Sequence, residues 1–176
     1  MSKNMMVLMR GLSGSGKTHT AHELARTAGC DPASCIFSAA DFLDDTSTER
    51  HSTPHIEASH ADNMRRICGA IADRIQLVIV DNTNTRLWEM VEYIDLAKMC
   101  GYGVRIAHSR AEWRFDPVEC ARRCLHHSDE EITKRQLSKW EYWSPKNVEG
   151  LHHLIVSARH HRDYRDESPV LLNYPR

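Results

Sequence analysis

The 176-residue sequence has neither a long hydrophobic run nor an appreciable net charge. Its first apolar run, residues 5–9, is too short for a signal-peptide core, and no run reaches the roughly 20 residues that cross a bilayer. The formal net charge of −1 excludes the global positive charge that favours long duplexes or anionic membranes. No membrane partner is therefore expected, and a nucleic acid would have to be bound at a local basic site or as a chain end.

Cysteine is present without a pattern that would build a zinc site. The six cysteines occur in a chain with no export signal, which predicts reduced thiols and a cytoplasmic or nuclear protein. Cysteine and histidine cluster at one place, but the spacing there matches no common zinc motif: Cys120, Cys124, His126 and His127. A hydrophobic core must then hold the fold, and 41% hydrophobic residues in a chain of one-domain length can supply it.

Short apolar runs alternate with segments of helical periodicity. Strands are predicted at residues 5–9, 35–38, 77–80, 102–107 and 154–156, and helices around residues 21–28, 64–75 and 87–97. Residues 44–55 are polar and predict a loop, while Asp116 with Pro117, and Ser128 with Glu131, predict two further helix starts. The alternation predicts an α/β fold with a parallel sheet of about five strands and helices on both faces.

Residues 11–18 match the phosphate-binding motif G-x-x-x-x-G-K-[ST] in full, between a predicted strand and a predicted helix. Glycines let successive backbone N–H groups point at one anion, and the helix adds the positive end of its dipole. The motif predicts that ATP binds here, with Lys17 on the β- and γ-phosphates and the Thr18 hydroxyl on Mg²⁺. The predicted nucleotide-binding residues are Gly11, Leu12, Ser13, Gly14, Ser15, Gly16, Lys17 and Thr18.

Asp81 directly follows the predicted strand at residues 77–80. Ligands of parallel α/β sheets bind at the carboxyl ends of the strands, so a carboxylate there can hold Mg²⁺ beside the phosphates. The alternative is that Asp81, Asn82 or Thr85 caps the helix that follows. The metal role is favoured because this strand is one of the best core strands in the sequence.

Asp41 follows the predicted strand at residues 35–38. From that position its carboxylate can accept the proton of a hydroxyl that attacks the γ-phosphate. A solvated loop acid is the alternative, and Asp44 and Asp45 are equally available neighbours.

Four arginines surround the helix start at Asp116, and arginines on a mobile lid commonly stabilise a phosphoryl group in transfer. They are Arg110, Arg114, Arg122 and Arg123. The alternative is an ordinary solvated helix face, because nearby acids almost balance these charges.

Several segments resemble the polynucleotide-kinase-like branch of the P-loop kinases, and within it the Nedd-four-binding protein two-like family. They are residues 10–18 (RGLSGSGKT), 37–42 (FSAADF), 81–84 (DNTN) and 88–90 (WEM). Weaker matches lie at residues 101–104, 113–116 and 122–126, and the similarity covers about residues 5–145. The DNTN and WEM segments are more specific than the phosphate-binding loop.

The resemblance implies a kinase that uses ATP and Mg²⁺ to phosphorylate a 5′-hydroxyl of RNA or DNA. It implies Asp41 as the general base and Arg123, with Arg122 second, as the lid arginine that acts on the donor. Family members often have an acidic pair in this segment, and Ala40 replaces its first acid here. The alternatives are a small-molecule or nucleoside kinase of the same fold, and a catalytically weak ATP-binding adaptor.

The predicted organisation is a P-loop kinase domain over residues 1–157 with an arginine-bearing lid at about residues 109–128. Residues 158–176 are predicted to form a polar C-terminal tail.

Overall fold

The computed structural model describes residues 4–42, 53–125, 129–142 and 170–172. Helices and strands alternate along the described chain, as the sequence predicts. In chain order they are β1 Met5–Arg10, α1 Lys17–Thr27, α2 Pro32–Cys35, β2 Ile36–Phe37, η1 Ala39–Phe42, α3 Thr53–Ala72, β3 Leu77–Val80, η2 Leu87–Met90, α4 Val91–Met99, β4 Gly103–His108, α5 Pro117–Arg123, α6 Glu130–Ser138 and β5 Val170–Leu172.

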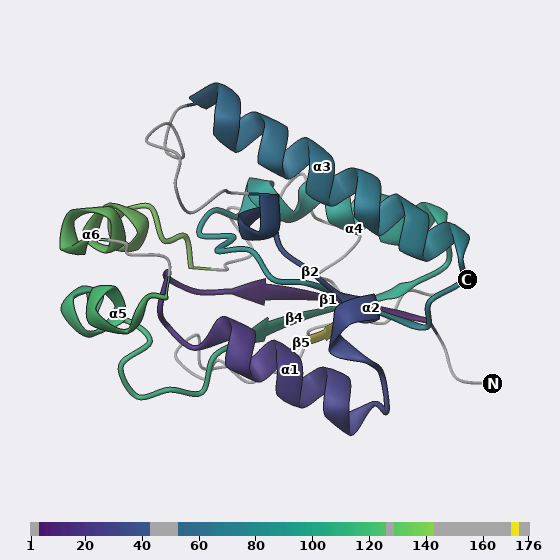
Figure 1. Cartoon of the computed structure of the whole chain (residues 1–176), viewed down its shortest axis with the longest axis horizontal. Coiled ribbons are helices and arrows are strands. Elements are labelled where there is room, and N and C mark those ends of the chain that lie inside the picture. The colour runs from purple at the N-terminus through teal and green to yellow at the C-terminus, as the bar shows by residue number, and fades with distance from the viewer. Residues whose placement is uncertain (1–3, 43–52, 126–128, 143–169, 173–176) are drawn as a thin grey trace.

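The strands form one five-stranded sheet in the order β2-β3-β1-β4-β5. β1 pairs in parallel with both β3 and β4, and β2 pairs in parallel with β3. Helices α1 and α2 cover one face of the sheet, and α3 and α4 cover the other (Figure 1). The predicted α/β fold with helices on both faces is confirmed, and its central strand is the one that leads into the phosphate-binding motif.

Alternate residues of β1 pack into the two halves of the core, because successive side chains of a strand point to opposite faces. Met6 and Leu8 pack with residues of α3 and α4, whereas Val7 and Met9 pack with residues of α1. The strand is buried on both faces, which is typical of a central parallel strand. Its carboxyl end at Arg10 is therefore fixed from both sides.

At three places before the last strand the structure differs from the sequence analysis. Helix α3 begins at Thr53, so Pro54 lies in the first turn of a helix, where a missing N–H is tolerated, rather than in the predicted loop. Asp129, not Ser128, caps α6, and its carboxylate accepts from the Ile132 N–H at 2.7 Å. Helix α2 is an additional element that the sequence analysis did not predict.

The fifth strand is also different from the prediction. β5 falls within the predicted C-terminal tail and pairs antiparallel with β4, so the sheet is not parallel throughout. The strand predicted at residues 154–156 lies outside the described residues. None of the helices in the described parts of the chain is long and apolar enough to span a membrane.

Helices α5 and α6 lie side by side beyond the carboxyl end of β1 (Figure 1). The carboxyl ends of β2 and β3 reach the same edge of the sheet, because all three strands run in parallel. This edge is where the sequence predicts the functional residues to gather.

Candidate nucleotide-binding site

The loop between β1 and α1 has the backbone that the glycine-rich motif requires. Gly14 and Gly16 have φ angles of 75° and 90°, in the left-handed region that favours glycine. A Cβ atom on Gly14 would lie 1.9 Å from the Cys120 carbonyl oxygen of α5, which leaves no space for any side chain. Helix α5 therefore packs directly on the loop, and the loop turns back toward the amino end of α1.

Lys17 is the first residue of α1, and its side chain folds back over the loop. Its Nζ donates to the Leu12 carbonyl at 2.7 Å, and the residue is 8% exposed. Burial lowers the pKa of the Lys17 ammonium below its usual value, and the nearby Asp81 carboxylate acts in the opposite direction. A buried ammonium beside a curled glycine backbone suits an anionic ligand such as a row of phosphates.

Thr18 and Asp81 come together although they are distant in the sequence. The Thr18 hydroxyl donates to Asp81 Oδ2 at 2.6 Å, and Asp81 is 6% exposed. Among the described residues no group forms a hydrogen bond with the buried Asp81 Oδ1 atom. A hydroxyl and a carboxylate with an unused buried oxygen are the hard ligands that Mg²⁺ prefers, so the residues fit this ion.

The capping alternative for Asp81 is not what the structure contains. Arg86 is the N-cap residue of η2, and its N–H donates to Glu89 at 3.1 Å. Asp81 lies five residues before this cap and directs its carboxylate to Thr18 instead. The same finding excludes Thr85 as the cap of this helix.

The Asp-Asn-Thr-Asn segment holds the strand ends together, which the sequence analysis did not anticipate. Asn82 Oδ1 accepts from the Ala39 N–H at 3.0 Å, and Asn84 Nδ2 donates to the Met9 carbonyl at 2.8 Å. The Thr83 carbonyl accepts from the Gly11 N–H at 2.9 Å. These bonds join η1, β1 and the phosphate-binding loop to the segment that carries Asp81.

Arg10 has a related structural role. It is 4% exposed, and its guanidinium donates to the carbonyls of Asn84 and Thr85 at 2.7 and 2.8 Å. The guanidinium also lies over the Trp140 ring, 4.2 Å from the centroid. Because its donors are directed at carbonyl groups of the scaffold, Arg10 anchors the site rather than presenting a charge to a ligand.

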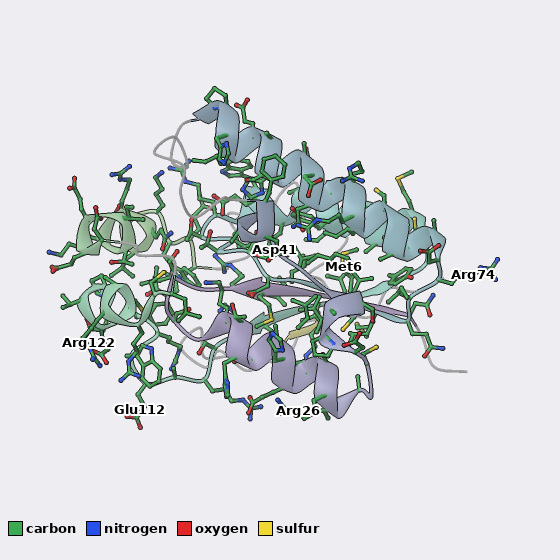
Figure 2. The ribbon with its side chains drawn as sticks, in the orientation of Figure 1. Met6, Arg26, Asp41, Arg74, Glu112 and Arg122 are labelled. Carbon is green, nitrogen blue, oxygen red and sulfur yellow. The ribbon has the colours of Figure 1, made fainter. Side chains whose placement is uncertain are left out.

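Asp41 lies in η1, close to α3 (Figure 2). Its Oδ2 accepts from the Ser38 N–H at 3.2 Å and from Arg66 Nη1 at 3.0 Å, and its side chain is 55% exposed. Arg66 also donates to the Ser38 carbonyl at 2.6 Å, so it fixes the turn that carries Asp41. The alternative acids Asp44 and Asp45 lie outside the described residues.

The lid arginines share one acid. Arg122 and Arg123 both donate to Glu119, at 2.7 and 2.5 Å. The hydrogen bond from Arg122 and, to a smaller extent, that from Arg123 lower the pKa of Glu119 to about 2. Arg123 also stacks 3.9 Å from the centroid of the Trp113 ring, whose Nε1 donates to the Gly14 carbonyl at 3.3 Å. Arg123 is thus connected to the loop through Trp113. Arg122 lies on α5 with its side chain 67% exposed (Figure 2).

The other two arginines of the predicted lid have different surroundings. Arg114 donates to the Ala111 carbonyl at 3.3 Å and lies near the Phe115 ring, and Arg110 is exposed. Gln136 of α6, which carried no signal in the sequence, does reach the loop: its Oε1 accepts from the Ser13 N–H at 2.8 Å.

Three comparisons agree with this geometry. A family model described as an AAA domain matches residues 6–143. Human NEDD4-binding protein 2 is 31% identical over 137 residues, which are 78% of this chain and 8% of that protein. The chain therefore spans less than a tenth of the length of this relative.

Two solved structures share the fold. The Pnkp1/Rnl/Hen1 complex matches 100% of this chain and 48% of its own chain with a TM-score of 0.53 at 15% identity. A kinase-like protein of Chloroflexus aurantiacus matches 80% of this chain and 78% of its own with a TM-score of 0.50 at 13% identity. The loop, the sheet order and the family match lead to one conclusion: the chain belongs to the AAA domain family of P-loop proteins and has a P-loop kinase-like fold.

Proposed function

We propose that this protein transfers the γ-phosphate of ATP to the 5′-hydroxyl of a polynucleotide, with Mg²⁺ as cofactor. The observation that carries the proposal is the 2.6 Å contact between Thr18 and Asp81, beside the buried Lys17 ammonium. This arrangement provides hard oxygen ligands and a fixed positive charge at the mouth of a glycine-rich loop. P-loop enzymes use that combination to bind a nucleoside triphosphate with its metal ion.

On the donor side, the backbone N–H groups of residues 11–18 bind the phosphates, and Lys17 binds the β- and γ-phosphoryl oxygens. Thr18 and Asp81 would hold Mg²⁺, which would neutralise part of the phosphate charge when bound. Arg123 extends from the lid toward the loop and stabilises the charge of the transferring group. Arg122 supports Arg123 through the shared Glu119.

On the acceptor side, Asp41 takes the proton of the attacking hydroxyl. The hydroxyl oxygen then forms a bond to the γ-phosphorus, the bond from that phosphorus to the β-phosphate oxygen breaks, and ADP leaves. Arg66 and the Ser38 N–H hold one carboxylate oxygen of Asp41 and so fix its orientation. The other carboxylate oxygen is then available to the acceptor hydroxyl.

A polynucleotide end is the proposed acceptor because of the segments that resemble polynucleotide-kinase-like proteins. A net charge of −1 is compatible with an enzyme that reads a chain end rather than a long duplex. The proposed catalytic unit is residues 1–157, with a lid at about residues 109–128 and a tail at residues 158–176. We infer a cytoplasmic or nuclear location from the six cysteines, all of which are free thiols.

A second candidate is an ATP-binding adaptor with weak catalysis. Two observations favour it: Ala40 stands where related sequences often have an acid, and Asp41 is already engaged by Arg66 at 3.0 Å. In this case the donor side would bind ATP normally, and transfer would be slow because position 40 supplies no carboxylate to act as the base.

A transfer assay with radiolabelled ATP separates these functions. The acceptors are 5′-hydroxyl RNA, 5′-hydroxyl DNA and a panel of nucleosides, with 5′-phosphorylated oligonucleotides as the negative control. We expect label on the 5′-hydroxyl oligonucleotides in the presence of Mg²⁺ and none with a Lys17→Ala preparation. Labelling of nucleosides alone would make the protein a small-molecule kinase, and ATP binding without any transfer would make it an adaptor.

A further inference from the structure

The peptide group between Leu12 and Ser13 is held from both of its ends. Its carbonyl oxygen accepts from Lys17 Nζ at 2.7 Å, and its N–H donates to Gln136 Oε1 at 2.8 Å. Because a peptide group is planar, the orientation of the N–H fixes the orientation of the carbonyl. Gln136 therefore fixes the carbonyl that holds the ammonium group of Lys17.

The contact between Gln136 and Ser13 uses both ends of the side-chain amide. Gln136 Nε2 donates to Ser13 Oγ at 2.9 Å, in addition to the bond that Oε1 accepts from the Ser13 N–H. Two bonds between the same pair of residues define the position and the rotation of the glutamine amide. Gln136 therefore binds the loop through specific hydrogen bonds and not only through the packing of α6.

Helix α6, which carries Gln136, is bonded to the helix that carries Arg122 and Arg123. The Thr133 hydroxyl of α6 donates to the Pro117 carbonyl at the start of α5 at 2.7 Å, and Thr133 is fully buried. Helix α5 in turn places its Cys120 carbonyl against Gly14. The two helices thus contact adjacent residues of the loop, α5 at Gly14 and α6 at Ser13.

We propose that Gln136 is a positioning residue that sets Lys17 for the β- and γ-phosphates through the Leu12–Ser13 peptide group. This coupling joins the position of the α5–α6 hairpin to the geometry of the phosphate site, so that Arg123 and Lys17 are set in place together. The inference rests on the proposed ATP binding. It assigns a function to a residue on α6 that no motif in the sequence identifies.

The test is the affinity of Gln136→Met for ATP and for AMP, measured by displacement of a fluorescent ATP analogue. Methionine fills a similar volume without the two hydrogen bonds, and AMP lacks the phosphates that Lys17 binds. We expect the ATP affinity to fall by about 10-fold and the AMP affinity to stay within about 2-fold, as the loss of two hydrogen bonds would produce. Ser138→Ala, on the exposed side of the same helix, is the control and should leave both affinities unchanged.

Gln136→Asn provides a second variant if methionine disturbs the helix. Its amide is one methylene shorter, so it cannot make both bonds to Ser13, and it adds no charge beside the phosphates. We expect the ATP affinity to fall about as far as in Gln136→Met, with the AMP affinity and the thermal midpoint close to those of the native protein.

Three results would overturn the inference. An equal loss of ATP and AMP affinity would reduce Gln136 to a packing residue, and native ATP and AMP affinities in both variants would remove its role. Failure of the native protein to bind ATP would instead refute the proposed function, and the inference with it.

Discussion

The donor half and the acceptor half of the site are built in different ways. On the donor side, Lys17 and Asp81 are 8% and 6% exposed and are fixed by hydrogen bonds of 2.6 to 2.7 Å. On the acceptor side, the Asp41 side chain is 55% exposed, and its position depends on an ion pair with Arg66. Lys17 begins α1 and Asp81 directly follows the inner strand β3, whereas Asp41 belongs to a short 3-10 helix after the edge strand β2.

This difference indicates that the two halves can change independently. A buried, interlocked donor site tolerates little substitution, because an altered charge or a lost partner has no water to replace it. An exposed acid in a turn can be replaced or repositioned at small cost in folding. The donor half should therefore keep nucleotide binding under substitutions that alter or abolish transfer.

The largest expected effect is that of Lys17→Ala. We expect it to abolish ATP-dependent stabilisation and phosphoryl transfer while the protein stays folded, because the side chain interacts with a single loop carbonyl and its burial lowers its pKa. Isothermal calorimetry measures ATP binding, circular dichroism measures folding, and the transfer assay measures phosphoryl transfer. Lys98→Ala on the exposed end of α4 is the control, and native-like ATP affinity in Lys17→Ala would remove the central claim.

Next in size is the effect of Asp41→Asn on the transfer rate. Loss of a general base lowers the rate by about 10²- to 10⁴-fold, or about 3 to 5 kcal/mol of barrier, and ATP affinity should stay nearly unchanged. Asp62→Asn, which alters the other carboxylate bound by Arg66, should leave the rate unchanged. Transfer is measured under single-turnover conditions with saturating ATP.

A separate Ala40→Asp variant, measured beside Asp41→Asn, distinguishes an enzyme from an adaptor. Transfer that appears only in Ala40→Asp would show that the native chain is an adaptor and not an enzyme. A fully active Asp41→Asn protein would exclude Asp41 as the base and direct attention to Asp44 and Asp45.

A smaller effect on the transfer rate is expected for the predicted lid arginines, Arg122 and Arg123. They are neighbours at the end of α5 and so form a matched pair. Arg123→Met should lower the transfer rate by about 10²-fold, because removal of one donor to the developing charge commonly has an effect of this order. Arg122→Met should lower it by less than about 3-fold, since the Arg122 side chain is largely exposed and donates to Glu119 on its own helix. Equal losses in the two variants would show that both arginines act on the donor.

Asp81→Asn should lower the magnesium-dependent part of ATP stabilisation. A ligand at about 100 times its Kd stabilises the native state by about 2.7 kcal/mol, so a weakened metal site should reduce this shift toward zero. Thermal melts with ATP, with and without Mg²⁺, measure the difference, and Asp95→Asn on the exposed face of α4 is the control. The same magnesium-dependent shift in both proteins would remove the metal role of Asp81.

The smallest expected effect is the pH dependence caused by His108 at the end of β4. Burial, with the charges of Arg10 and Arg114, lowers the pKa of His108 to about 3. The unfolded chain therefore binds more protons between about pH 3 and the ordinary histidine pKa of about 6.5, so stability rises with pH across this window.

Between about pH 5 and about pH 7.5 this histidine should add about 2 kcal/mol to the free energy of unfolding. His108→Phe should flatten the profile in that range, because it keeps a ring beside Trp140 without a titrating group. Urea unfolding at several pH values measures this, with the exposed His22→Asn variant as control. An unchanged slope in His108→Phe would assign the acid sensitivity to other groups.

The parts that sequence analysis missed share a cause. β5 has only three residues, too few to show a period, and the start of α3 at Thr53 and the cap at Asp129 lie in polar segments with weak periodicity. Gln136 could not be found either, because one glutamine on an amphipathic helix looks like any solvated residue. Its partner Ser13 is 123 positions away, and no spacing rule connects the two.

The sequence by itself determined the glycine-rich loop, the alternation of strands and helices, and the acid at the end of β3. These features depend on residues close in the chain: glycine conformations, apolar periodicity and the positive end of a helix. The tertiary structure alone decided that Asp81 meets Thr18, that Arg66 holds Asp41, and that Arg123 reaches the loop through Trp113. Those partnerships follow from the strand order and from helix packing, which bring distant side chains into contact at the carboxyl edge of the sheet.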